Sequence, residues 1–206
     1  MDFFDIHTHS SDAAPASSVL NTASYIADRN ISIGLHPWDI NDAWECKLRD
    51  IRNAAREDNV IAIGECGIDK LKSPADITMQ TEVFRQQALL AEEVAKPLII
   101  HCVKSFDEII AIYKQIIPKQ PWIIHGFRGN KQQAEQLIKS GFYLSLGERF
   151  NEECAKVIPC DRLFIESDES TKSIAEIYQS IAAARGITLV ELNVLINKNR
   201  SRIIQF

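Results

Sequence analysis

Two histidines separated by one residue, His7 and His9, follow an apolar pair near the start of the chain. Side chains alternate between the two faces of a strand, so both imidazoles point the same way, about 7 Å apart. Such a pair can chelate one divalent metal ion. Asp5 lies one pleat earlier on this face, where its carboxylate could orient an imidazole. For this motif alone, a polar strand end with two hydrogen-bonded histidines is an equal alternative.

The histidines of this sequence all follow short apolar segments that we expect to be buried strands. They are His7, His9, His36, His101 and His125. Glu65 and Asp168 lie at or just beyond the ends of two further segments of this kind. In a barrel of parallel strands the carboxyl ends meet at one mouth, where active sites are built. The sequence therefore predicts a metal site at these strand ends.

The predicted ligand set is too large for a single structural zinc ion and fits two divalent ions that share a carboxylate. We expect Glu65 to be the bridge, because a carboxylate at the end of the most apolar strand needs a partner charge. The predicted ligands are His7, His9, Glu65, His101, His125 and Asp168. Zinc, manganese and magnesium are all candidates, since ligand type alone does not fix the ion.

Three other residues near these strand ends are candidates for substrate contact. His36 precedes Pro37 and is either a substrate contact or a turn residue. Trp38 could stack on a base or sugar, with a core or rim aromatic as the alternative. Arg128 could bind a phosphate, with a solvated loop arginine as the alternative.

Apolar runs alternate with amphipathic patterns over the whole chain, which predicts an α/β fold with a parallel sheet. Strands are expected at residues 3–9, 31–35, 60–64, 98–100, 122–124, 142–146 and 163–165. Helices are expected at residues 42–56, 78–95, 105–117, 131–140 and 151–157, and two or three more from Thr171 to Gln205. A TIM-type (β/α) barrel is the nearest match, with an open doubly wound sheet as the alternative. A further short strand at Val19 and Leu20 is left open.

Composition places the chain among ordinary globular proteins and predicts one domain over residues 1–206. The formal net charge of −5 argues against a broad nucleic-acid surface, although metals can supply positive charge at a small site. No apolar run approaches the roughly 20 residues of a membrane span, and the first residues do not resemble a signal peptide. Five cysteines without a paired spacing fit a reduced, cytoplasmic protein. The sequence does not indicate a protein partner.

At its polar motifs the chain resembles the TatD-type family of metal-dependent hydrolases, also called TatD-related deoxyribonucleases. The motifs occur in the family order over nearly the whole chain. They are Asp5-Ile-His7-Thr-His9, Gly34-Leu-His36-Pro37, Ile63-Gly64-Glu65-Cys-Gly67-Ile-Asp69, the helical set Gln80, Phe84, Gln87 and Leu90-Ala91, Pro97-Leu-Ile-Ile-His101, His125-Gly-Phe127-Arg-Gly129 and Leu163-Phe-Ile-Glu166-Ser-Asp168. The resemblance implies a TIM-type barrel in which His7, His9, Glu65 and Asp168 hold one metal. His101 and His125 would hold the second, with Glu65 shared.

Three departures from the family pattern affect the expected substrate site. Residues 10–30 are shorter than usual, so we expect a shortened or distorted barrel with about seven strands and a lost N-terminal helix. An arginine usual after the fifth strand is replaced by Val103, which leaves neighbouring Lys104 as the candidate phosphate contact. The usual Glu-Thr-Asp-Ser-Pro is here Glu166-Ser-Asp-Glu-Ser170, so the proline is lost.

The resulting expectation is a phosphodiesterase or deoxyribonuclease in which a metal-bound hydroxide attacks phosphorus. Asp168 is expected to orient this nucleophile and take its proton, and Glu65 to hold the metal pair. Expected substrates are phosphodiesters, with single-stranded DNA ends favoured over intact duplex. One alternative function is an amidohydrolase acting on a small ester, lactone or amide. Such enzymes often bridge two metals with a modified lysine, whereas this sequence has Glu65 at the corresponding position. A second alternative is a metal-binding scaffold without catalysis.

Overall fold

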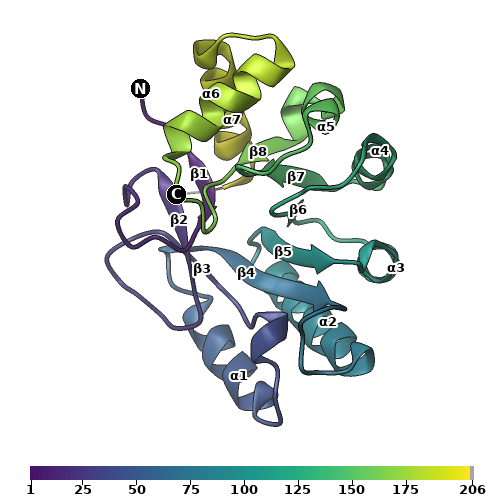
Figure 1. The fold of residues 1–206 in the computed structure, drawn as a ribbon. Helices are drawn as coiled ribbons and strands as arrows, with labels where there is room; N and C mark the ends of the chain where they lie inside the picture. Colours follow the sequence, from purple (N-terminus) through teal and green to yellow (C-terminus); the bar gives the residue numbers. More distant parts are fainter. Residues whose placement is uncertain (205–206) are drawn as a thin grey trace. The chain divides into compact units, whose positions relative to one another are not determined.

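The computed structural model describes residues 1–204, and these form two compact units. Of the described residues, the first unit contains 1–20 and 123–204, and the second runs from Asn21 to Trp122. Strands and helices alternate within each unit (Figure 1). The single domain expected over residues 1–206 stays a prediction. Gln205, the expected end of the last helical segment, lies outside the described residues.

The sheet of the first unit is parallel and built from short buried strands. Its strands are β1 (Asp5–Thr8), the start of β2 (Ser18–Thr22), β6 (Trp122–Ile124), β7 (Tyr143–Leu146) and β8 (Leu163–Ile165). Asp5 pairs with Ser18 between β1 and β2, and Leu144 pairs with Leu163 between β7 and β8. A parallel bridge between Thr8 and Asp168 joins β1 to the segment after β8. The polar residues of β1 and those that follow β8 are therefore neighbours.

Helices of the first unit begin at well-defined caps. They are α4 (Lys131–Lys139), α5 (Glu152–Val157), α6 (Ile174–Arg185) and α7 (Leu189–Ile203), with a 3₁₀ turn, η2, at Cys160–Arg162. Reciprocal capping boxes start α4 at Asn130, α6 at Ser173 and α7 at Thr188. The hydroxyl of Tyr178, a buried residue of α6, donates a hydrogen bond of 2.7 Å to the Phe4 carbonyl. This bond ties α6 to the residue that precedes β1.

The second unit has β4 at the centre of its parallel sheet. Its elements are β3 (Ile31–Ile33), the 3₁₀ turn η1 (Pro37–Asp39), α1 (Trp44–Ala54), β4 (Val60–Asp69), α2 (Ile77–Glu93), β5 (Leu98–Val103) and α3 (Phe106–Ile116). β4 pairs with β3 on one side and β5 on the other. α2 packs on β4, as Figure 1 shows, and its buried Gln87 accepts from the Leu35 amide at 2.7 Å. The helix thereby fixes the loop that carries His36.

A glycine allows the unusually close approach of β4 and β5. Gly67 has a φ of 149°, and a Cβ atom there would lie 1.9 Å from the His101 carbonyl oxygen. Gly67 pairs with His101 in the sheet. Only a residue without a side chain fits this contact, which sets His101 beside the residues of β4.

The expected alternation of strands and helices is confirmed, and the fold class is that of a TIM-type (β/α) barrel. Details of the strands differ from the expectation. The strand left open at Val19 and Leu20 is present as β2 and makes eight strands among residues 1–204, where about seven were expected. The described residues 9–17 and 23–30 contain no helix, as expected for a shortened barrel. Glu65 lies inside β4 and His101 inside β5, rather than after these strands, because the pairing of β4 with β5 continues to Asp69 and Val103.

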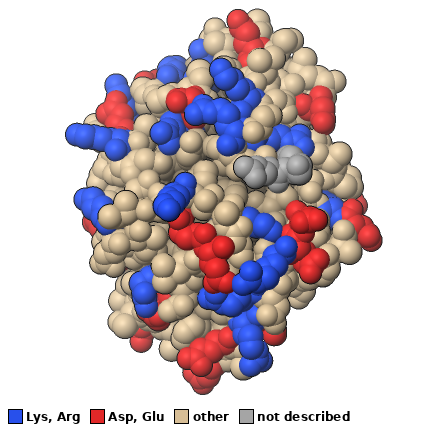
Figure 2. Space-filling model, turned by 180° about the vertical axis from the view of Figure 1, so that it is seen from behind, with Lys and Arg blue, Asp and Glu red and all other residues tan. Residues whose placement is uncertain are grey.

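The surface and helices bear on two further expectations. Positive and negative side chains are interspersed on the face seen in Figure 2, in keeping with the small net charge of −5.

Among residues 1–204 no single helix is long and apolar enough to cross a membrane. The pair α6 and α7 reaches the required length and composition together, but is bent by 106° at Gly186 and its neighbours.

Candidate metal centre

Three histidines of the first unit gather around Asp168, and we call the four residues the His7 cluster: His7, His9, His125 and Asp168. The Asp168 Oδ1 atom lies 3.8 Å from His7 Nε2 and 3.6 Å from His9 Nε2. The rings of His7 and His125 are stacked at a tilt, with centroids 4.5 Å apart. His7 is fully buried, whereas His9 lies at the surface. Strand β1 and the residue that follows it thus present His7 and His9 toward Asp168, as strand alternation predicts.

Asp168 is held in an unusual backbone conformation by its pairing with β1. Its φ is 53°, in the left-handed region that few side chains other than those of asparagine and aspartate adopt readily. The Asp168 amide donates to the His7 carbonyl at 2.9 Å, and the His9 amide donates to the Asp168 carbonyl at 3.2 Å. These two bonds fix the carboxylate against both histidines. The conformation therefore belongs to the site rather than to a flexible loop.

A buried network beneath the His7 cluster joins Asp5 to Ser167. The Asp5 carboxylate accepts from the Ser167 hydroxyl at 2.6 Å, from the Ser167 amide at 3.0 Å and from the His7 amide at 3.3 Å. Burial raises the pKa of Asp5 to about 7, against the opposite effect of the hydrogen bonds from Ser167. The role of Asp5 in orienting an imidazole stays a prediction. Its hydrogen bonds hold the backbone of both segments that carry the cluster.

Replacing the serine of this network should reduce stability without touching the metal-ligand candidates. We expect Ser167→Ala to lower the free energy of unfolding by about 1–3 kcal/mol, because a buried oxygen of Asp5 loses its strongest donor. Ser167→Thr keeps the hydroxyl and is the matched control. Urea denaturation of both variants measures the difference; equal stability of Ser167→Ala and wild type would contradict the role given to the network.

Glu166 is a site residue that our sequence analysis did not single out. Its side chain is completely buried, and Oε1 lies 3.4 Å from His125 Nδ1 and accepts from the Gly126 amide at 2.6 Å. Burial acts to raise the pKa of Glu166, but His125, with smaller effects from His7 and Ser145, holds this pKa below its ordinary value. The ionised Glu166 carboxylate therefore faces Nδ1 of His125 and can fix the orientation of the imidazole ring.

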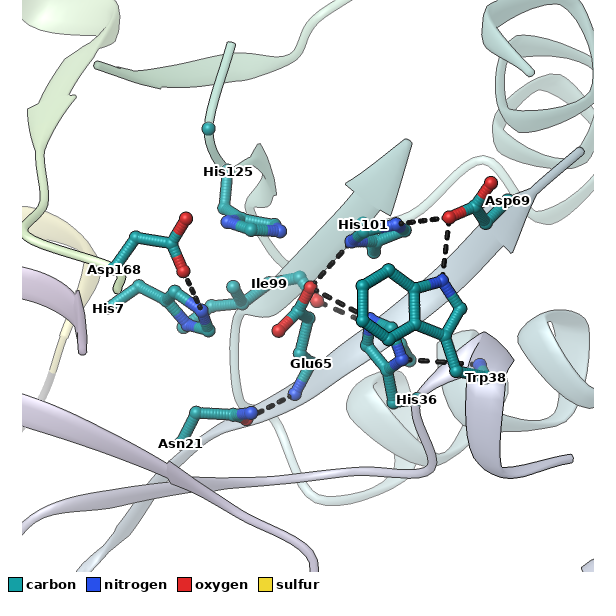
Figure 3. Close-up of polar contacts among 12 residues, drawn as sticks. His7, Asn21, His36, Trp38, Glu65, Asp69, Ile99, His101, His125 and Asp168 are labelled. Atoms are coloured by element: carbon teal, nitrogen blue, oxygen red, sulfur yellow. Dashed lines mark hydrogen bonds and ion pairs between the residues drawn. The ribbon is translucent and has the colours of Figure 1, made fainter. Parts of the chain in front are cut away.

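Three residues of the second unit form another group, which we call the Glu65 cluster: His36, Glu65 and His101. Glu65 Oε1 lies 2.7 Å from His101 Nδ1 and 3.2 Å from His36 Nε2 (Figure 3). The Glu65 side chain is buried, and its amide donates to Asn21 Oδ1 at 2.7 Å. Contact of His36 with substrate stays a prediction. In the structure its imidazole faces the Glu65 carboxylate.

A buried carboxylate, Asp69, completes this side of the cluster and was also missed as a site residue. Asp69 Oδ2 lies 3.2 Å from His101 Nε2 and accepts from the Trp38 indole nitrogen at 2.6 Å. Burial acts to raise the pKa of Asp69, but hydrogen bonds from Trp38, the Leu71 and Lys72 amides and His101 lower it overall. Asp69 is therefore ionised near neutral pH and engages both the histidine and the indole.

The two cationic candidates for phosphate contact lie at the surface. Arg128 lines a cavity of about 200 Å³ that also includes Gly126, Glu166 and Asp168. Lys104 follows β5 directly and is exposed, with a left-handed φ of 55°. Arg128 is thus placed beside the His7 cluster of its own unit. Both roles in substrate binding stay predictions.

The donors in both clusters have the chemistry and spacing that divalent ions require. In each case three ligand atoms lie within 4.8 Å of one another, from His7, His125 and Asp168 in one cluster and from His36, Glu65 and His101 in the other. A tetrahedral ion with bonds of about 2.0–2.1 Å separates its ligands by roughly 3.3 Å, so small side-chain shifts suffice. Mixed imidazole and carboxylate donors suit zinc and manganese. The residues present therefore fit the implied metal ions.

A (β/α) barrel fold with imidazole–carboxylate clusters at its strands defines the class of this protein, a metal-dependent hydrolase. Residues 5–205 match the family described as TatD related DNase. The chain belongs to this family.

Two relatives illustrate the sequence similarity. Over 195 residues the chain is 33% identical to the uncharacterized metal-dependent hydrolase YabD of Bacillus subtilis (strain 168), covering 84% of this chain and 76% of that protein. Over 144 residues it is 29% identical to the 3'-5' ssDNA/RNA exonuclease TatD of Erwinia tasmaniensis, covering 66% of this chain and 56% of that protein.

Solved structures agree on the fold. The TatD homologue YJJV of Escherichia coli K12 superimposes with a TM-score of 0.83 at 19% identity, covering 98% of both chains. A TatD family hydrolase of Entamoeba histolytica gives a TM-score of 0.80 at 16% identity, covering 99% of this chain and 98% of that one.

Proposed function

We propose that this protein is a metal-dependent phosphodiesterase that removes nucleotides from the ends of single-stranded nucleic acid. The observation that carries the proposal is the presence of two imidazole–carboxylate clusters in a TatD-family chain. Relatives named 3'-5' ssDNA/RNA exonucleases support nucleic acid as the substrate. The net charge of −5 supports action at strand ends, because an acidic chain has little attraction for long duplexes. The five cysteines support a cytoplasmic location.

We assign one divalent ion to each cluster, which gives two per chain. His7, His9, His125 and Asp168 would hold the first, and His36, Glu65 and His101 the second. Bound there, the ions would lower the pKa of a water molecule and offset the charge of the phosphate. Sharing of Glu65 by both ions, and the pairing of His125 with His101, stay predictions from the resemblance.

The roles of the chain's own groups follow from their contacts. Asp168 is fixed through its backbone and 23% of its side chain is exposed, so it can accept a proton from the attacking water. Glu166 and Asp69 hold the rings of His125 and His101 by their second nitrogens. Arg128 would contact the substrate phosphate beside the His7 cluster.

The test of this proposal measures metal content and activity together. We expect close to two zinc or manganese ions per chain by elemental analysis, and loss of activity on chelation that returns when the ions are restored. With metal, a single-stranded oligonucleotide should be shortened from an end faster than the same sequence as duplex. Supercoiled duplex that is cut internally and fastest would contradict the substrate. Hydrolysis of esters or lactones, with no hydrolysis of phosphodiesters, would favour the amidohydrolase alternative. Metal binding with no hydrolysis of any substrate would favour a scaffold without catalysis.

A further inference from the structure

Trp38 is a large aromatic residue that is both exposed and rigidly held. Its side chain is 42% exposed, yet its indole nitrogen donates to the buried Asp69 carboxylate at 2.6 Å. Proline at the start of η1 fixes the backbone on one side, and the Trp38 amide donates to His36 Nδ1 at 3.2 Å on the other. An exposed indole that is anchored so tightly loses little conformational freedom on binding a ligand.

The indole also adjoins the Glu65 cluster directly. Its ring centroid lies 4.7 Å from that of His36 and 5.8 Å from that of His101, both nearly perpendicular to it. Figure 3 shows the indole beside His36 and His101. Any planar group that stacks on its open surface would therefore sit next to whatever the Glu65 cluster binds.

A lysine side chain lies over the indole. The Lys72 ammonium group lies 4.6 Å from the centre of the Trp38 ring, from an exposed position in the loop after β4. A cation over an indole is attracted by the ring electrons, but at an exposed site this contact is weak, about 0.5–1 kcal/mol. An incoming flat group could displace the ammonium at small cost. The displaced ammonium would remain close to the bound group.

We propose that Trp38, anchored by Asp69, is a base-stacking subsite for the nucleotide whose phosphate is bound at the Glu65 cluster. Lys72 gives up the ring surface to the base and contacts a phosphate of the same strand. This inference rests on the proposed function and names the part of the substrate that this unit recognises. Stacking on an aromatic ring is tolerant of base identity, because every base has a π-face. The subsite would therefore select unpaired bases over sugar–phosphate alone or bases held in a duplex.

The kinetic test uses two substrates that differ only in their bases: an oligodeoxythymidylate and an oligomer of equal length with abasic residues at its end. We expect Trp38→Leu to raise KM for the first by about 5- to 150-fold, the range for loss of one stacked base, and to leave the second nearly unchanged. Trp38→Phe should recover part of the loss. Lys72→Gln should raise KM for both substrates alike, since both contain phosphate. Trp44→Leu, which removes a half-buried tryptophan of α1, is the matched control with unchanged KM.

A binding measurement keeps the inference independent of turnover. Oligodeoxythymidylate added to the metal-loaded protein should quench tryptophan fluorescence, and Trp38→Leu should abolish this quenching while Trp44→Leu retains it. Equal KM values for wild type and Trp38→Leu on both substrates, with quenching unaltered, would overturn the subsite. Hydrolysis of neither substrate by the metal-loaded wild type would instead overturn the proposed function; quenching lost only in Trp38→Leu would then still support the subsite.

Discussion

Asp168→Asn should lower turnover by about 10²–10⁴-fold while metal content and melting temperature remain close to those of the wild type. The substitution keeps the shape of the side chain and removes its ability to accept a proton. Asparagine also tolerates the left-handed φ of 53°, and both backbone bonds to His7 and His9 stay available. His7, His9 and His125 remain to hold the ion. The loss of turnover would therefore measure the contribution of Asp168 as a proton acceptor.

Two other roles for Asp168 make different predictions. The following helix, α6, is capped by Ser173 and Glu176 through a reciprocal box, so its cap does not involve Asp168. If Asp168 were only a metal ligand, occupancy and rate would fall together, and excess metal would restore both. Steady-state rates at saturating zinc or manganese, with elemental analysis, separate these roles. Glu169→Gln, at the exposed neighbouring carboxylate, is the control and should keep the wild-type rate.

Glu65→Gln should weaken metal binding by about 10²-fold or more and reduce turnover with it. The buried carboxylate contacts both histidines of its cluster, His36 and His101, and is the only anion among these three donors. A neutral amide offers an ion no charge and places a nitrogen where one oxygen had been. Asn21 accepts its hydrogen bond from the backbone N–H of residue 65, which the substitution keeps, so strand β4 should stay in place.

The stoichiometry of this variant tests the predicted bridge. If Glu65 is shared, both ions should be lost at metal concentrations that saturate the wild type. If it serves the Glu65 cluster alone, close to one ion per chain should remain with the His7 cluster. Isothermal titration with zinc measures both outcomes, and Glu57→Gln, an exposed glutamate before β4, provides the control. Wild-type affinity in Glu65→Gln would contradict any role as a ligand.

The sequence by itself determined the order of strands and helices and the bounds of two of the strands. Strands β6 and β8 have the bounds predicted from their apolar runs, because an all-apolar segment of this length is stable only when buried on both faces. Histidines placed after such strands then have to lie at the same edge of a parallel sheet. Strand β2 was harder to predict, since its Ser18–Thr22 stretch contains only two strongly apolar residues.

Only the tertiary structure decided which residue faces which. Asp69 engages Trp38 and His101 because the register of β4 and β5 sets Gly67 opposite His101, and a register is a property of two strands. Glu166 faces His125 across 41 positions of chain, and Ser167 meets Asp5 through the bridge between Thr8 and Asp168. Such carboxylates look like ordinary polar residues in a sequence. Their role arises from burial beside a specific histidine, which depends on how distant strands pair and on how closely a glycine lets them approach.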